Sequence, residues 1–218
     1  EVLGSEVAAL DAVAKMIRAE GRVLPLCEIP LDIEADVAGL DSDPRIMRQV
    51  RGQVAVATTP GIVRRVRLNP EDPPACPAAL DAIAVADLVT LGPGSWFSSV
   101  LPHLVVPGVV DTLNRTNAMR VVVLNLDAEP GETAGFTAER HIHILKQHDA
   151  FFSADVVIVD ESALPSESER VHLDRAAANI GAKLVFYDLR EEDSKGYYTS
   201  RHDPEKLAAA MRSEYCGR

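Results

Sequence analysis

The chain has 218 residues and a formal net charge of −11 at pH 7, because 33 acidic residues outnumber 22 basic ones. A charge of this sign disfavours sequence-independent binding to nucleic acid or anionic lipid, which requires a basic surface. Apolar residues make up 47% of the chain, enough for a sizeable core, and no apolar run approaches the roughly 20 residues that span a bilayer. The cysteines Cys27, Cys76 and Cys216 are far apart and form no CxxC pair, which favours a reducing cytoplasm over a disulfide framework or a zinc module.

The first 22 residues predict a helix. Ser5 followed by Glu6 has the pattern of an N-cap, and apolar residues recur at helical spacing up to Gly21. The chain lacks an initiator Met, and residues 1–4 have the pattern of the last turn of a preceding helix. We therefore expect residues 1–22 to be a helical segment that continues a missing amino-terminal part of the core.

Residues 23–68 predict a β-rich insertion. Apolar and polar residues alternate there, as expected for strands with one solvent-exposed face. The alternating apolar positions are Leu31, Ile33, Ala35 and Val37, then Val54 and Val56, then Val66 and Leu68. Residues 69–77 contain four prolines and predict a connector.

Residues 78–218 predict an α/β core. Short apolar strands are expected over 87–91, 120–126, 156–160 and 183–188. Helices are expected over 78–84, 95–104, 107–112, 137–148, 167–179 and 204–215. Near-continuous apolar strands alternating with helices predict a mostly parallel sheet with helices on both faces. In such a sheet, ligands bind beyond the carboxyl ends of the strands.

The loop after the first of these strands reads Gly92-Pro-Gly-Ser95. Gly92 and Gly94 allow the backbone to approach a ligand, and Ser95 is placed to cap the next helix, whose first amides would form an anion site. Ser98 and Ser99 add hydroxyl groups one turn on. A tight strand-to-helix turn explains the same residues without a ligand. The loop is neither a full dinucleotide fingerprint nor a P-loop.

Other polar residues follow the later strands. Asn125, Asp127, Glu132 and Thr133 offer hydrogen-bonding groups to a nucleotide, although a polar turn accounts for them on the residues alone. Arg201 precedes the last helix and would suit a diphosphate, with an exposed loop residue as the simpler interpretation.

Three histidines lie in the helix expected over 137–148. His141 and His143 project in directions too different to bind one metal, and His148 lies seven residues from His141. Surface histidines are the preferred interpretation.

Residues 86–108, which contain the Gly-Pro-Gly-Ser block, resemble the signature of the YvcK-type gluconeogenesis factors. These belong to the broader CofD-like group, which includes 2-phospho-L-lactate transferase. Three further stretches match in order, over 21–25, 129–137 and 201–203. The resemblance thus covers nearly the whole chain.

The resemblance implies a Rossmann-like core with a β-rich insertion. It also implies a bacterial, cytoplasmic protein that binds UDP-sugars, notably UDP-N-acetylglucosamine, and supports cell shape and envelope growth on gluconeogenic carbon, with no established reaction. An NAD-like dinucleotide is an alternative ligand, and a homodimer and a regulatory protein partner are expected. On the residues and the resemblance together, the expected nucleotide and phosphate site comprises Gly92, Pro93, Gly94, Ser95, Ser98, Ser99, Asn125, Glu132, Thr133 and Arg201.

Two departures from the family pattern bear on function. The family opens with a strand and a Gly-Gly-x-x-Gly loop, neither of which this sequence contains, so part of the nucleotide cradle is expected upstream. The transferase branch carries Asn soon after Gly-Pro-Ser, whereas this chain has Gly94-Ser95, which favours the regulators. The alternative is a Mg²⁺-dependent transferase with Asp127 as a metal ligand. A structural module whose glycine loop is only a turn is the third hypothesis.

Overall fold

A parallel four-stranded sheet forms the centre of the computed structural model, which describes residues 4–43, 45–127, 133, 136–163 and 167–217. The strand order is β4-β5-β6-β7. The strands are β4 (Leu88–Leu91), β5 (Met119–Val123), β6 (Val156–Asp160) and β7 (Lys183–Tyr187). Every residue of β6 is buried, as expected for a central strand covered on both faces.

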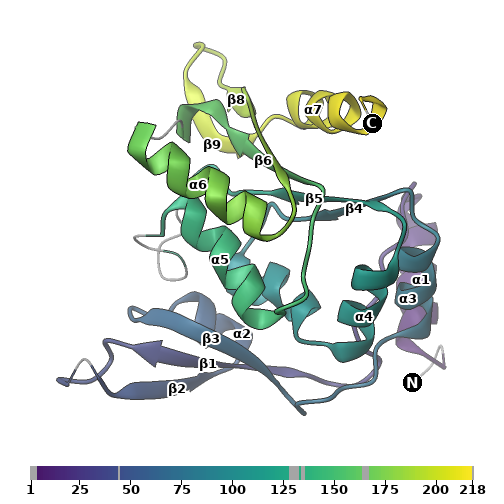
Figure 1. The fold of residues 1–218 in the computed structure, drawn as a ribbon. Helices are drawn as coiled ribbons and strands as arrows, with labels where there is room; N and C mark the ends of the chain where they lie inside the picture. Colours follow the sequence, from purple (N-terminus) through teal and green to yellow (C-terminus); the bar gives the residue numbers. More distant parts are fainter. Residues whose placement is uncertain (1–3, 44, 128–132, 134–135, 164–166, 218) are drawn as a thin grey trace.

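Helices cover both faces of this sheet (Figure 1). On one face, Val122 and Val157 share a hydrophobic cluster with Leu145 and Leu173. On the other face, Ile158 packs in a second cluster with Ala210. The helices are α3 (Pro77–Ala84), α4 (Pro107–Arg115), α5 (Ala138–His148), α6 (Glu167–Asn179) and α7 (Pro204–Cys216). The predicted fold class is thereby confirmed.

Residues 32–69 contain an antiparallel sheet in the order β2-β1-β3. Its strands are β1 (Asp32–Ala38), β2 (Met47–Arg51) and β3 (Ile62–Asn69). The buried face of this sheet includes Val37, Val63 and Val66, which belong to the same hydrophobic cluster as Trp96 and Phe97 of the core. The insertion therefore shares its apolar interior with the parallel sheet rather than closing around its own.

The structure corrects the prediction of a strand around Val54 and Val56, which lie in helix α2 (Gln53–Ala57). Gly52 has φ of 97°, which turns the chain out of β2, and the short helix buries Val56 while Val54 stays 76% exposed. Two apolar residues at i and i+2 do not distinguish a short helix from a strand. The polar hairpin of β8 (Arg190–Glu192) and β9 (Tyr198–His202) was also not predicted.

The helix boundaries mostly follow the sequence signals. Helix α1 (Glu6–Ile17) is capped by Ser5, whose Oγ accepts a hydrogen bond from Ala8 N at 3.1 Å, and Thr137 caps α5. The stretch expected as a helix over 95–104 is a π-helical turn η1 (Trp96–Val100) followed by a 3₁₀ turn η2 (Leu101–Leu104). A further 3₁₀ turn, η3 (Glu161–Ala163), follows β6.

Among the described residues, no single helix has the length and apolar character needed to cross a membrane. One pair, Trp96–Leu104 with Pro107–Arg115, meets the length and composition criteria only when its two parts are taken together across a 72° bend.

Candidate functional site

The loops that follow the parallel strands converge at one edge of the sheet. Hydrogen bonds join the loop after β4 to the loop after β5, through Gly94 and Asn125. Arg190, which follows β7, joins the ends of β5 and β6, through Asp127 and Asp160. Because all four strands are parallel, this edge carries all of their carboxyl ends, where ligands bind in open α/β sheets.

Two glycines give the Gly-Pro-Gly-Ser loop its shape, for different reasons. Gly92 has φ of +77°, and a Cβ at this position would lie 2.5 Å from the carbonyl oxygen of Val123. Only glycine lets the chain pass so close to β5. Gly94 has φ of +149° and no atom within 4 Å of a built Cβ. The backbone at Gly94 is thus open to a neighbouring molecule.

Asn125 holds this loop by two hydrogen bonds. Its Oδ1 accepts from Gly94 N at 2.9 Å, and its Nδ2 donates to Gly94 O at 2.9 Å. The amide of Gly94 is therefore already bound within the protein, and Asn125 shapes the loop from beneath. A phosphate at this corner would have to use other groups of the loop.

The serines after the glycines are arranged differently from the prediction. Ser95 stands at the N-cap position, but its side chain makes no capping hydrogen bond. Its Oγ instead contacts Oγ of Ser98, which is buried. Ser99 is exposed and lines a cavity of about 340 Å³ together with Gly92 and Pro93. The walls of this cavity are mostly apolar residues of α3, α4 and β4.

A partly buried arginine that sequence reasoning missed joins the strand ends. Arg190 donates to both carboxylate oxygens of Asp127, at 3.0 and 3.3 Å, and to the carbonyl of Leu126 at 3.1 Å. Its Nε also donates to Asp160 at 3.3 Å and to Ser162 at 2.9 Å. The side chain of Arg190 is only 16% exposed. The one available signal was its place, two residues beyond the last predicted strand.

Asp160 is ionised in this network. Burial raises the pKa of Asp160, but hydrogen bonds from Ser162, the amide of Leu189 and Arg190 outweigh burial, so that the pKa lies below its ordinary value. The negative charge of Asp160 in turn holds the Arg190 guanidinium in place.

The other predicted site residues differ in how far they are exposed. Thr133 is fully buried, and Glu132 lies outside the described residues. The side chain of Arg201 is 79% exposed, with its nearest carboxylate, Glu191, at 3.6 Å. The next residue, His202, has a buried Nε2 with no hydrogen-bond partner among the described residues.

The prediction of surface histidines is wrong for His141. Its side chain is 5% exposed, its Nδ1 lies 2.9 Å from the carbonyl of Thr137, and its ring packs edge-on against Trp96 with a centroid distance of 5.1 Å. Burial lowers the pKa of His141, which keeps the ring neutral. The sequence pattern could not show that this face of α5 packs under the glycine loop.

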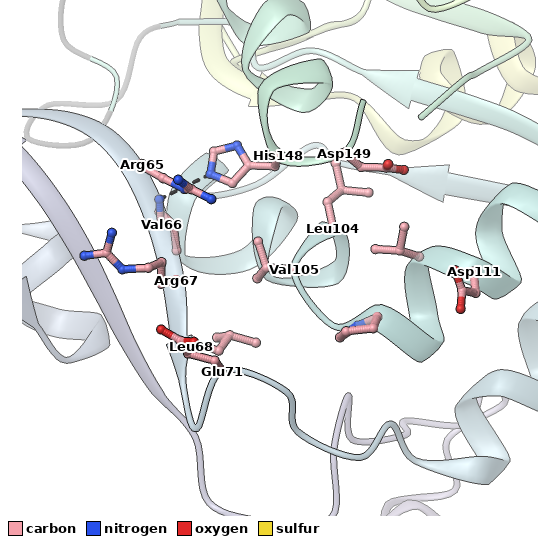
Figure 2. Close-up of a pocket in the computed structure, with 12 residues that line it drawn as sticks. Arg65, Val66, Arg67, Leu68, Glu71, Leu104, Val105, Asp111, His148 and Asp149 are labelled. Atoms are coloured by element: carbon pink, nitrogen blue, oxygen red, sulfur yellow. Dashed lines mark hydrogen bonds between the residues drawn. The ribbon is translucent and has the colours of Figure 1, made fainter. Parts of the chain in front are cut away.

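A second cavity, of about 430 Å³, lies where β3 meets α4 and α5 (Figure 2). His148 points into this junction and joins the two parts. Its Nε2 accepts a hydrogen bond from Val66 N at 3.2 Å, while its Nδ1 donates to the carbonyl of Ile144 at 2.8 Å. The bond from Val66 requires an unprotonated Nε2 and therefore the neutral ring.

The described residues do not form a metal site. No group of three or more His, Cys, Asp and Glu side chains in this part of the chain is arranged to hold a metal ion. Asp127, the metal ligand expected under the transferase hypothesis, instead accepts from Arg190 through both of its oxygens.

A parallel sheet with helices on both faces, in the strand order β4-β5-β6-β7, defines a Rossmann-like α/β protein. Comparison with known families narrows this class. The family model described as 2-phospho-L-lactate transferase CofD matches residues 1–202, and the chain belongs to the CofD family.

Within this family, the chain is similar to the YvcK-type gluconeogenesis factors. It is 54% identical to a protein of Mycobacterium tuberculosis named "Putative gluconeogenesis factor", over 97% of this chain and 60% of the relative. It is 28% identical to the Bacillus subtilis "Gluconeogenesis factor", over 96% of this chain and 66% of that protein. The chain thus spans about three fifths of the length of its mycobacterial relatives.

Solved structures support the fold. A UPF0052 family member from Bacillus halodurans superimposes with a TM-score of 0.79 at 23% identity, over 97% of this chain and 68% of that chain.

Proposed function

We propose that this chain is the nucleotide-sugar-binding part of a regulatory protein that links gluconeogenic carbon metabolism to cell-envelope synthesis and cell shape. The ligand would be a UDP-sugar of the UDP-N-acetylglucosamine type, with an NAD-like dinucleotide as the alternative. The cytoplasm, where nucleotide sugars are made, is the expected location. The observation that carries the proposal is the open space at the Cβ position of Gly94, in a loop at the carboxyl ends of parallel strands.

The geometry of the loop supports a diphosphate ligand through three features. Gly94 leaves room for close approach, and Ser99 presents an exposed hydroxyl. Arg190 supplies positive charge beneath the same strand ends, although two carboxylates already neutralise it. A diphosphate would therefore rely on backbone amides and hydroxyls more than on an ion pair.

A transferase is the second candidate, because the matching family model is named for a transferase and Asp127 lies at the end of β5 with its side chain 57% exposed. The described residues do not fit Mg²⁺ around Asp127, because Arg190 occupies both carboxylate oxygens.

Thermal unfolding of the full-length protein tests the proposal. UDP-N-acetylglucosamine or UDP-glucose at about 100 times its dissociation constant adds about 2.7 kcal/mol of stability, which raises Tm by several degrees. Gly94→Val should abolish this shift. Gly39→Val is the matched control, because Gly39 also has positive φ and open space but lies in the β1–β2 hairpin.

Two outcomes would contradict the proposal. One is a Tm shift with NAD or GTP and none with either UDP-sugar. The other is an undiminished UDP-sugar shift in Gly94→Val. Magnesium-dependent turnover of a phospholactate-type substrate that is lost in Asp127→Ala would favour the transferase instead.

A further inference from the structure

A third cavity, with charged walls, lies between β3 and α5. It has a volume of about 530 Å³ and is lined by Arg64 of β3 and by residues of α5, including Glu139, Arg140 and His143. None of these residues belongs to the glycine loop or to the Arg190 network.

The position of Arg64 is set by a β-bulge. In the pairing of β1 with β3, Asp36 lies opposite Arg65 and Val37 lies opposite Val63, so Arg64 is the extra residue. Bulges redirect a side chain out of the regular alternation of a strand. Arg64 is exposed and lines the cavity, whereas the neighbouring Arg67 pairs with Asp36 through two hydrogen bonds of 2.7 Å.

Arg140 faces the same cavity from the first turn of α5. Its guanidinium lies 4.2 Å from the ring centroid of Phe136, so the side chain is held in place by an aromatic face rather than by a carboxylate. Burial, and then repulsion from Arg64, lower the pKa of Arg140. The two side chains line the same cavity, which brings their positive charges near one another.

Glu139, the carboxylate that lines the cavity, contacts His143 rather than Arg64 or Arg140 among the ion pairs of the described residues. Glu139 Oε1 lies 3.1 Å from Nε2 of His143, one turn further along α5. Within the described part of the chain, neither Arg64 nor Arg140 has an ion-pair partner. Both side chains line one cavity, so they place two positive charges beside the same space.

We propose that Arg64 and Arg140 bind the phosphate group of a soluble phosphorylated small molecule, at a site separate from the glycine loop. Two guanidinium groups match a phosphate in charge, since a phosphate monoester carries about −1.5 to −2 at pH 7 and accepts paired N–H donors. The cavity volume falls in the range of small-molecule sites, about 300–1,000 Å³. The acidic surface would repel a polyanion such as a nucleic acid.

This site would join the insertion to the core. Arg64 comes from β3 and Arg140 from α5, so a bound phosphate bridges the two elements beside the hydrogen bond between Val66 and His148. A phosphorylated metabolite would thereby stabilise the junction of the insertion and α5.

The test uses inorganic phosphate and glycerol 3-phosphate as probes, with glycerol and with chloride at equal ionic strength as references. Binding is measured by calorimetric titration and by the rise in Tm. Arg64→Gln and Arg140→Gln should each weaken probe binding about tenfold or more. Arg51→Gln is the control, because Arg51 lies in the same antiparallel sheet and pairs with Asp32 at 2.7 Å.

Arg140→Gln removes a side chain that packs on Phe136, so a loss of binding in that variant has two explanations. Arg64→Gln changes an exposed side chain and therefore tests the phosphate contact alone. Gly94→Val should leave phosphate binding unchanged, so failure of this proposal and failure of nucleotide-sugar binding are distinguishable. No binding of either probe beyond the chloride reference would overturn the proposal. Probe binding lost in Gly94→Val but retained in both arginine variants would assign the phosphate to the glycine loop and overturn it as well.

Discussion

Asn125 has a structural role in the candidate site, because it holds the glycine loop in place. One side-chain amide satisfies both backbone groups of Gly94, so it fixes the position of the loop that would contact a ligand. This arrangement resembles the pairing of two strands, with a side chain in place of the second backbone. Its geometry depends on a donor and an acceptor in one planar group, which only Asn and Gln provide.

We therefore expect Asn125→Asp to destabilise the protein by about 1–3 kcal/mol, because a carboxylate cannot donate to the Gly94 carbonyl and would face it with like charge. The free energy of unfolding in urea measures this loss. Asn117→Asp is the control, since Asn117 is exposed. Equal stability of the two variants would show that the Gly94 bonds contribute nothing.

At the scale of single residues, the sequence predicted the turn at Gly92 and Gly94 better than it predicted the side-chain contacts around it. Glycine spacing located the Gly92–Gly94 turn because backbone geometry depends on residue type directly. Arg201 was predicted from its position before the last helix, and Arg190 was not considered. Only the hairpin of β8 and β9 decides that Arg190 lies under the strand ends while Arg201 faces solvent, and its polar residues carry no periodic signal.

The contact between α5 and β3 shows how one helix organises two sheets. Helix α5 packs Leu145 toward the parallel sheet and presents His148 to the backbone of β3. The backbone amide of Val66 lies on a half-buried edge, and His148 Nε2 is its acceptor. Because this nitrogen must carry no proton, the contact depends on pH.

Burial lowers the pKa of His148, and the charge of Arg65 lowers it further, against a hydrogen bond to Ile144 that raises it. Burial lowers the pKa of His141 and His202 in the same way. Such a histidine binds more protons in the unfolded state, so stability is full above the ordinary pKa of 6.5 and falls as pH drops toward the lowered value.

His148→Gln should therefore reduce the dependence of the unfolding free energy on pH between about 7 and 5, because glutamine offers an acceptor that does not titrate in this range. Urea unfolding at a series of pH values gives the slope. The exposed His172 provides the matched control, and His172→Gln should keep the slope of the unchanged protein. A slope unaltered by His148→Gln would assign the acid sensitivity to other groups.

At the scale of elements, segments with a continuous or repeating apolar pattern were predicted, whereas segments without one were not. The parallel strands and α5, α6 and α7 were located because burial on one or two faces repeats over several residues. Strand β2 was missed because it exposes most of its side chains and so has no apolar alternation, and α2 was mistaken for a strand because its valines stand at i and i+2. Their conformation is fixed by the neighbours against which they pack rather than by local pattern.

At the scale of the whole molecule, the insertion and the core share one continuous apolar interior. Helix α2 packs against η1, and β3 packs against η2, so the antiparallel sheet is seated on the segment that follows the glycine loop. Phe97 and Leu101, both fully buried, lie in the cluster that includes Val37 and Val63 of the insertion. A region that looks like a separate β-rich unit in sequence thus depends on the core for burial of its inner face.

We expect the two parts to unfold as one cooperative unit. Trp96 is the only tryptophan, is fully buried and stands at this junction, so its fluorescence reports the junction while circular dichroism reports the whole chain. The two urea transitions should coincide.

Phe97→Ala should lower the unfolding free energy by about 3–5 kcal/mol and shift both midpoints together, because it opens a cavity shared by insertion and core. Phe151→Ala makes the same substitution at a side chain that is 84% exposed and should shift neither midpoint measurably. A fluorescence transition that precedes the dichroism transition, widened by Phe97→Ala, would mean that the insertion unfolds on its own and that the shared cluster does not couple it to the parallel sheet.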